Sequence, residues 1–126
     1  MTRYYDTIAE FERDGYDIIV DKTWEELSIK DCFDDTQFDI AEMLHNFEHG
    51  NLDWFMLRVR VMVEGLELGS AYVGGCLYAD AKEVLTGVTA EDFIAEAMVE
   101  AKSNVYRLYK KFAALNEELE REGVTV

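Results

Sequence analysis

The chain has 126 residues, of which 49% are hydrophobic and 13% aromatic, as expected for one folded domain rather than a disordered acidic tail. It carries 27 acidic and 12 basic residues, which gives a formal net charge of −15. This balance argues against direct binding to nucleic acid, which needs lysine and arginine at the phosphates, and against docking on an anionic membrane.

The apolar stretches are too short for a transmembrane helix, and the first residues lack the pattern of a secretory signal. We therefore expect a cytoplasmic protein. Cys32 and Cys76 do not form a C-x-x-C motif, so both are expected to be buried, reduced thiols.

The first quarter of the chain predicts short, mixed elements. Apolar residues at helical spacing in residues 4–14, followed by Gly15, predict a short helix that ends at the glycine. The β-branched residues 16–20 predict an edge strand. Thr23 and Glu26 have the spacing of a capping box, which predicts one or two helical turns after Thr23.

Residues 34–50 predict a second helix of about three turns. Its apolar residues recur at helical spacing from Phe38 to Phe47, and Gly50 follows them. The acidic residues at its start lie where the helix dipole favours negative charge.

Residues 53–78 predict a β-hairpin. Apolar residues from Phe55 to Val63 alternate with a second set that includes Arg58 and Arg60, and strict alternation is typical of a strand. Glu64-Gly65 is the expected turn, and the glycines of the second strand indicate bulges or close contacts. The arginines are expected on the exposed face of the sheet.

The last third predicts one or two helical turns at residues 79–85 and then one long helix. From residue 89 its apolar side chains recur at spacings of three and four, and the later ones follow a heptad pattern. About 30 residues give a length of roughly 45 Å. Such a helix either projects from the domain or pairs with a second copy.

Together these elements predict an α+β fold: a small antiparallel sheet, with its hairpin at about 53–78, packed with helices and followed by a long C-terminal helix. Residues 1–126 show no change of composition that would divide them, so we expect a single acidic domain.

The two histidines form the pattern H-x-x-E-H, known from inverted zinc metalloproteases. His45 and His49 lie one turn apart, Glu48 is the candidate general base, and Glu42 could complete a ligand set. However, Gly50 places the pair at a helix C-terminus, where the dipole favours histidine without a metal. We therefore expect no bound metal, no cofactor and no catalytic residue.

The distribution of acidic residues is the more informative pattern. Residues 1–53 hold 15 acidic and 4 basic residues, and Asp92, Glu96 and Glu100 form a ladder one turn apart. Each step of the ladder is about 6 Å, close to the axial span of two phosphates on one DNA strand. The predicted partner-binding acids are Asp6, Glu10, Asp14, Asp17, Asp21, Glu25, Glu26, Asp31, Asp34, Asp35, Asp39, Glu42, Asp92, Glu96 and Glu100. Trp54, opposite the apolar strand face, is a candidate anchor for the same partner.

The acidic runs, together with the segments Asp53–Val63, Gly65–Ser70 and Gly74–Tyr78, resemble the small acidic proteins of phages and mobile elements. These include antirestriction and anti-CRISPR proteins of the DNA-mimic type. The resemblance implies a non-catalytic viral inhibitor in the host cytoplasm. Its partner would be the basic surface of a host defence complex that binds DNA or RNA, such as a CRISPR effector or a restriction enzyme.

Three functions follow as hypotheses. The first is an inhibitor with an acidic, phosphate-mimicking surface. The second is a metal-dependent hydrolase that uses His45, Glu48 and His49. The third is a non-catalytic assembly protein that forms a homodimer through the heptads of residues 101–119 and has a merely solvated acidic face.

Overall fold

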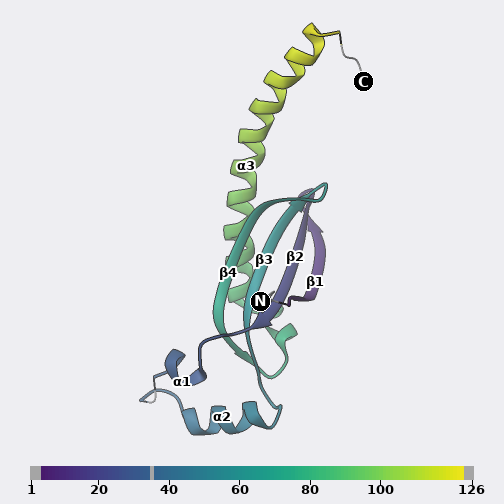
Figure 1. Ribbon diagram of the computed structural model, residues 1–126. Helices are drawn as coiled ribbons and strands as arrows, with labels where there is room; N and C mark the ends of the chain where they lie inside the picture. Colours follow the sequence, from purple (N-terminus) through teal and green to yellow (C-terminus); the bar gives the residue numbers. More distant parts are fainter. Residues whose placement is uncertain (1–3, 35, 124–126) are drawn as a thin grey trace.

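The computed structural model describes residues 4–34 and 36–123. Its elements follow one another in the order β1 (Asp6–Arg13), β2 (Tyr16–Trp24), α1 (Ile29–Cys32), α2 (Ile40–Glu48), β3 (Asp53–Val63), β4 (Leu66–Tyr78), the 3-10 helix η1 (Ala81–Thr86) and α3 (Val88–Arg121). This is an α+β fold, as the sequence predicts (Figure 1).

The four strands form one antiparallel sheet in the order β1-β2-β3-β4. Each hairpin has a tight two-residue turn: Asp14-Gly15 joins β1 to β2, and Glu64-Gly65 joins β3 to β4. All four turn residues have positive φ (56°, 87°, 51° and 79°), which matches the primed turns that suit the twist of a hairpin. Both turns lie at the same end of the sheet, as Figure 1 shows.

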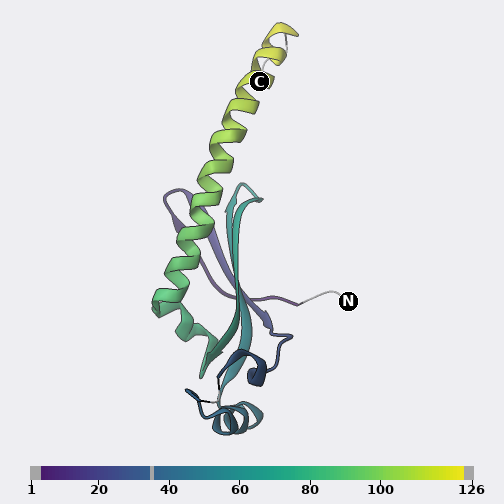
Figure 2. The ribbon, with the colours of Figure 1, turned by 90° about the vertical axis from the view of Figure 1, so that its left-hand side faces the viewer.

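The core lies between one face of the sheet and the first half of α3. The strands contribute the fully buried side chains of Ile18, Val20, Phe55, Leu57, Val59 and Val61. The helix contributes Ile94 and Met98 together with Ala97 and Ala101, and the two small alanines let it approach the sheet closely. At the closest point, a Cβ on Gly69 would lie 2.1 Å from the carbonyl oxygen of Ala97. α3 covers only one face of the sheet (Figure 2).

α3 is longer than the sheet it covers. Its 34 residues extend past the β3–β4 turn, and the C-terminal half projects away from the domain (Figures 1 and 2). Among the described residues, the last hydrogen bond from α3 to the sheet is donated by the Asn104 side chain to the carbonyl of Leu68. No helix among the described residues combines the length and the apolar run that a membrane span requires.

The short helices α1 and α2 lie at the end of the sheet opposite the two turns (Figure 1). α2 begins only at Ile40, because Asp34 instead holds a turn, accepting a hydrogen bond from the backbone N–H of Thr36 at 2.9 Å. Asp39 is the N-cap and accepts from the backbone N–H of Glu42. The predicted helix is therefore present but shorter than residues 34–50.

Three predictions for the N-terminal segment are wrong. Residues 6–13 form a strand instead of a helix: a bulge between Thr7 and Ala9 turns both Ile8 and Ala9 toward the core, and this irregularity imitates helical spacing. No helix starts at Thr23, which lies inside β2 and whose hydroxyl donates to the carbonyl of Tyr4; the single turn α1 begins only at Ile29. β2 is moreover an interior strand, not an edge.

The remaining predicted elements are confirmed. The hairpin at 53–78, its turn, the short helical segment before Gly87 and the long C-terminal helix all occur. The residues Phe55, Leu57, Val59 and Val61 are buried as the alternation predicts.

Candidate acidic interaction surfaces

A buried ion cluster occupies the uncovered face of the sheet. The carboxylate of Asp21, only 1% exposed, accepts hydrogen bonds from Arg58 at 2.7 and 2.9 Å, from Arg60 at 3.1 Å and from the Thr7 hydroxyl at 2.8 Å. The guanidinium of Arg58 also lies 3.4 Å from the centre of the Tyr5 ring. Asp21 was predicted as a partner-binding acid; this is wrong, because its carboxylate is enclosed by its own partners.

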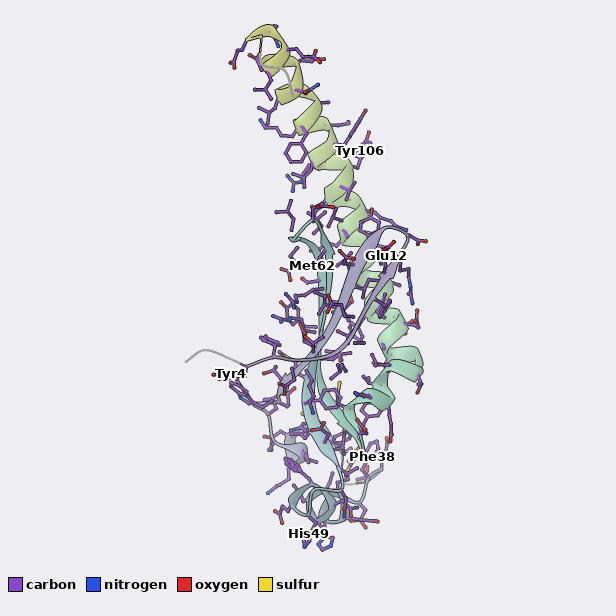
Figure 3. All side chains as sticks on the ribbon, turned by 90° about the vertical axis from the view of Figure 1, so that its right-hand side faces the viewer. Tyr4, Glu12, Phe38, His49, Met62 and Tyr106 are labelled. Carbon is purple, nitrogen blue, oxygen red and sulfur yellow. The ribbon has the colours of Figure 1, made fainter. Side chains whose placement is uncertain are left out.

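Next to this cluster, four exposed acids gather on the β1–β2 hairpin. Glu10 and Glu12 lie on the uncovered sheet face of β1, Asp17 lies directly opposite Glu12 on β2, and Asp14 is in the turn. We call Glu10, Glu12, Asp14 and Asp17 the acidic hairpin patch. Figure 3 shows Glu12 at the turn end of the sheet.

The cations nearest to this patch are engaged by other carboxylates. Arg13 forms two hydrogen bonds with Glu91, at 3.0 and 3.1 Å, and Arg58 and Arg60 are held by Asp21. The Glu91 hydrogen bond is the main cause of the raised pKa of Arg13, and the charge of Asp14 is a minor one. Within the described residues, no acid of the patch forms an ion pair, so its negative charge faces solvent.

The ladder of Asp92, Glu96 and Glu100 is exposed on α3. These three residues share one face of the helix, and Ile94, Ala97 and the other buried side chains lie on a different face. The ladder therefore points away from the sheet. It therefore faces the opposite direction from the acidic hairpin patch, and the two do not form one surface.

A third group of acids lies on the α1–α2 segment at the far end of the sheet. Asp31, Asp34, Asp39 and Glu42 are all exposed. Two of them also make hydrogen bonds within this segment. Asp31 accepts from the Ser28 hydroxyl, and Asp34 accepts hydrogen bonds from Thr36, which lower the pKa of Asp34. Asp35 lies outside the described residues.

The other three predicted acids are near the start of the sheet and in the loop after β2. Asp6 and Glu26 are exposed. Glu25 is partly buried and holds the loop to β4, because its carboxylate accepts hydrogen bonds from the backbone N–H groups of Leu27 at 3.2 Å and Gly75 at 2.9 Å. Glu25 is thus used inside the chain, and its role in partner binding stays a prediction.

Trp54 is likewise engaged within the protein. Its indole N–H donates to the carbonyl of Leu27 at 2.9 Å, and its ring lies 5.9 Å from the ring of Phe33. These contacts attach the α1 segment to the sheet. Trp54 is therefore an internal anchor, and its predicted role at a partner interface has no support from its position.

The histidines lie at the C-terminal end of α2, which leads into β3, and Figure 3 shows His49 at the tip of the molecule opposite the end of α3. Their ring centres are 4.1 Å apart, and Nδ1 of His49 lies 2.8 Å from the carbonyl oxygen of His45. Both side chains are exposed. The described residues contain no group of three or more histidine, cysteine or acidic side chains placed to hold a metal ion.

The thiols differ from the prediction in one respect. Cys76 is buried, and this burial raises its pKa to about 11. Cys32 is exposed rather than buried. Its pKa is also raised, mainly by partial desolvation and secondly by the negative charges of Glu25 and Asp31. Both are free thiols.

Sequence reasoning missed Glu12 as a member of the patch, because a helix was expected there. The available clue was Asp14-Gly15, a dipeptide typical of two-residue hairpin turns. An Asp-Gly turn between two segments of similar length would have paired Glu12 with Asp17. Comparisons of the chain with protein families, with curated proteins and with solved structures find no match.

Proposed function

We propose that this protein is a stoichiometric, non-catalytic inhibitor that binds the basic groove of a nucleic-acid-binding protein. The observation that carries the proposal is the acidic hairpin patch, whose four exposed carboxylates have no ion-pair partner among the described residues. A basic groove would supply the missing cations, and electrostatic attraction would speed the encounter.

The arrangement of the patch also supports a phosphate-like role. Glu10 and Glu12 are successive residues on one face of a strand, so their spacing is about 6.8 Å. A nucleic-acid strand carries one phosphate per about 3.4 Å of helix axis, so the two carboxylates repeat negative charge at about half that axial density. Glu12 and Asp17 face each other across the strands, an arrangement of like charges that costs stability.

Asp21 compensates one of the two arginine charges on this sheet face. Arg58 and Arg60 share the sheet face with the patch and, if free, would cancel part of its negative potential. The Asp21 carboxylate holds both of them instead. One positive charge is left on this face, and the four exposed acids of the patch outnumber it.

Because of the resemblance to phage anti-defence proteins, CRISPR effectors and restriction enzymes are the first targets to test. Such inhibition needs only occupancy of the groove. No catalytic group is required for it.

The test is capture of proteins from a nuclease-treated bacterial lysate on the immobilised protein. A target should be released both by high salt and by added duplex DNA or RNA, because both compete for the same groove. It should also lose binding of its nucleic acid when the purified protein is added in equimolar amount.

The matched variants are Glu10→Gln/Glu12→Gln/Asp17→Asn in the patch and Asp92→Asn/Glu96→Gln/Glu100→Gln on the ladder, each of which removes three charges. The patch variant should lose the target, whereas the ladder variant should retain it. Equal loss in both would show a nonspecific charge effect, and retention by both would reject the patch as the binding surface.

A further inference from the structure

The apolar stripe of α3 continues after the sheet beneath it has ended. Ala90, Ile94, Ala97 and Ala101 pack against the sheet, and the same helix face continues as Val105, Leu108, Phe112, Leu115 and Leu119. We call these five residues the tail stripe. Phe112 is 56% exposed, Leu115 46% and Leu119 41%, although they continue a face that is buried at Ala101, three turns before Phe112.

The start of the tail stripe and the β3–β4 turn enclose an apolar notch of about 380 Å³. Val63, Leu66 and Leu68 line it from the hairpin, and Leu108 and Phe112 line it from α3. Leu66 is itself 55% exposed. The exposed apolar surface is therefore continuous from the hairpin turn to the end of the helix.

We propose that the tail stripe pairs with the tail stripe of a second copy of this chain, with the two α3 helices antiparallel. The heptad spacing of the stripe suits two helices packed side by side. With Phe112 against Leu115 of the second copy, Leu108 meets its Leu119. The end of each helix then lies beside the notch of the other copy.

Two observations select the antiparallel orientation. The first is steric: upstream of Val105 the same helix face is covered by the sheet, so a parallel partner helix would run into the hairpin (Figure 2). An antiparallel partner extends in the other direction, and its helix ends at Arg121, near the notch.

The second observation is charge. Basic residues Arg107, Lys110 and Lys111 precede the midpoint of the tail stripe, and acidic residues Glu117, Glu118 and Glu120 follow it. Antiparallel pairing brings the basic block of one copy beside the acidic block of the other, whereas parallel pairing aligns like with like. In the register above, Lys111 lies beside Glu118 of the second copy.

The test is sedimentation equilibrium from about 1 to about 100 µM, a range that resolves micromolar dimers. Twice the mass of 14.5 kDa is expected. Leu115→Asp should give a folded monomer, because Leu115 lies beyond the sheet, and its urea unfolding should stay cooperative but no longer depend on protein concentration. A wild-type protein that stays monomeric over the whole range would overturn the proposal.

Charge exchange tests the orientation. Lys111→Glu and Glu118→Lys should each weaken the dimer about tenfold, since each affects two symmetric pairs, and the double variant should restore it. Lys110→Glu makes the same charge change on the opposite side of the helix and is the matched control. A dimer that is insensitive to Lys111→Glu, or one not restored by the double variant, would reject the antiparallel register.

These results are independent of the proposed inhibition. Variants of the acidic hairpin patch should leave the mass of the particle unchanged, and Leu115→Asp should leave the patch intact.

Discussion

Asp21 and Arg58 face each other across β2 and β3 and are joined by two hydrogen bonds, of 2.7 and 2.9 Å, on the sheet face that α3 does not cover. Arg60 and Thr7 donate to the same carboxylate. This cluster seals the uncovered face by polar contacts, in place of a second helical layer.

Because the carboxylate is buried and serves three donors, Asp21→Asn should lower the free energy of unfolding by about 2–4 kcal/mol. The arginines keep some access to water, which limits the loss. Urea unfolding measures the effect. Asp17→Asn, an exposed acid four residues away, should change stability by less than about 0.5 kcal/mol. Equal effects of the two substitutions would refute the structural role of Asp21.

Gly69→Ala tests the close packing of α3 on β4. The added methyl carbon would lie 2.1 Å from the carbonyl oxygen of Ala97 and 2.8 Å from the backbone nitrogen of Ala101, so the helix would have to move. A loss of about 3 kcal/mol or more is expected in urea unfolding. At Gly87 the nearest atom is 3.7 Å away, and Gly87→Ala should change little. A mild effect at Gly69 would mean that α3 can shift without cost.

The sequence predicted the elements whose pattern is regular over many residues. The alternation from Phe55 to Val63 correctly predicted the first strand of the hairpin, and the apolar repeat of α3 correctly predicted the long helix. In both elements one face packs against the core along many residues, so the apolar pattern is regular. The prediction for β1 was wrong for a physical reason. The bulge at Ile8 breaks the alternation of the strand, and only pairing with β2 makes this segment a strand.

The candidate site was less predictable than the fold. Exposure of an acid depends on residues far away in the sequence: Asp21 is buried because Arg58 and Arg60 lie across from it, and Glu25 is occupied by the N–H of Gly75. A count of acidic residues contains no such information. Pairing of β1 with β2 is what separates the acidic hairpin patch from the acids that hold the structure together.

The two thiols should react at different rates. Cys76 is buried with a pKa of about 11, so at pH 8 it is almost entirely protonated and shielded, whereas Cys32 is exposed. A disulfide reagent added to the native protein should modify one thiol quickly and the second only after unfolding. Cys32→Ser should remove the fast reaction. Two fast equivalents in the native protein would contradict the burial of Cys76.

The opposed acids Glu12 and Asp17 allow a test of the patch without any target. Glu12→Lys replaces a repulsive cross-strand pair by an attractive one, so it should raise the free energy of unfolding by about 0.5–1 kcal/mol at low salt. Screening should reduce this gain at about 1 M salt, where the Debye length is about 3 Å. Urea unfolding at both salt concentrations measures it.

The control for this prediction is the same substitution in an Asp17→Asn background. There Glu12→Lys has lost its charged partner, and most of the gain should vanish. If the gain persists, it comes from the reduced net charge of the whole protein and not from the pair. If it vanishes, the wild-type hairpin retains a destabilising pair of acids on an exposed face, and a partner that contributes cations would relieve this repulsion on binding.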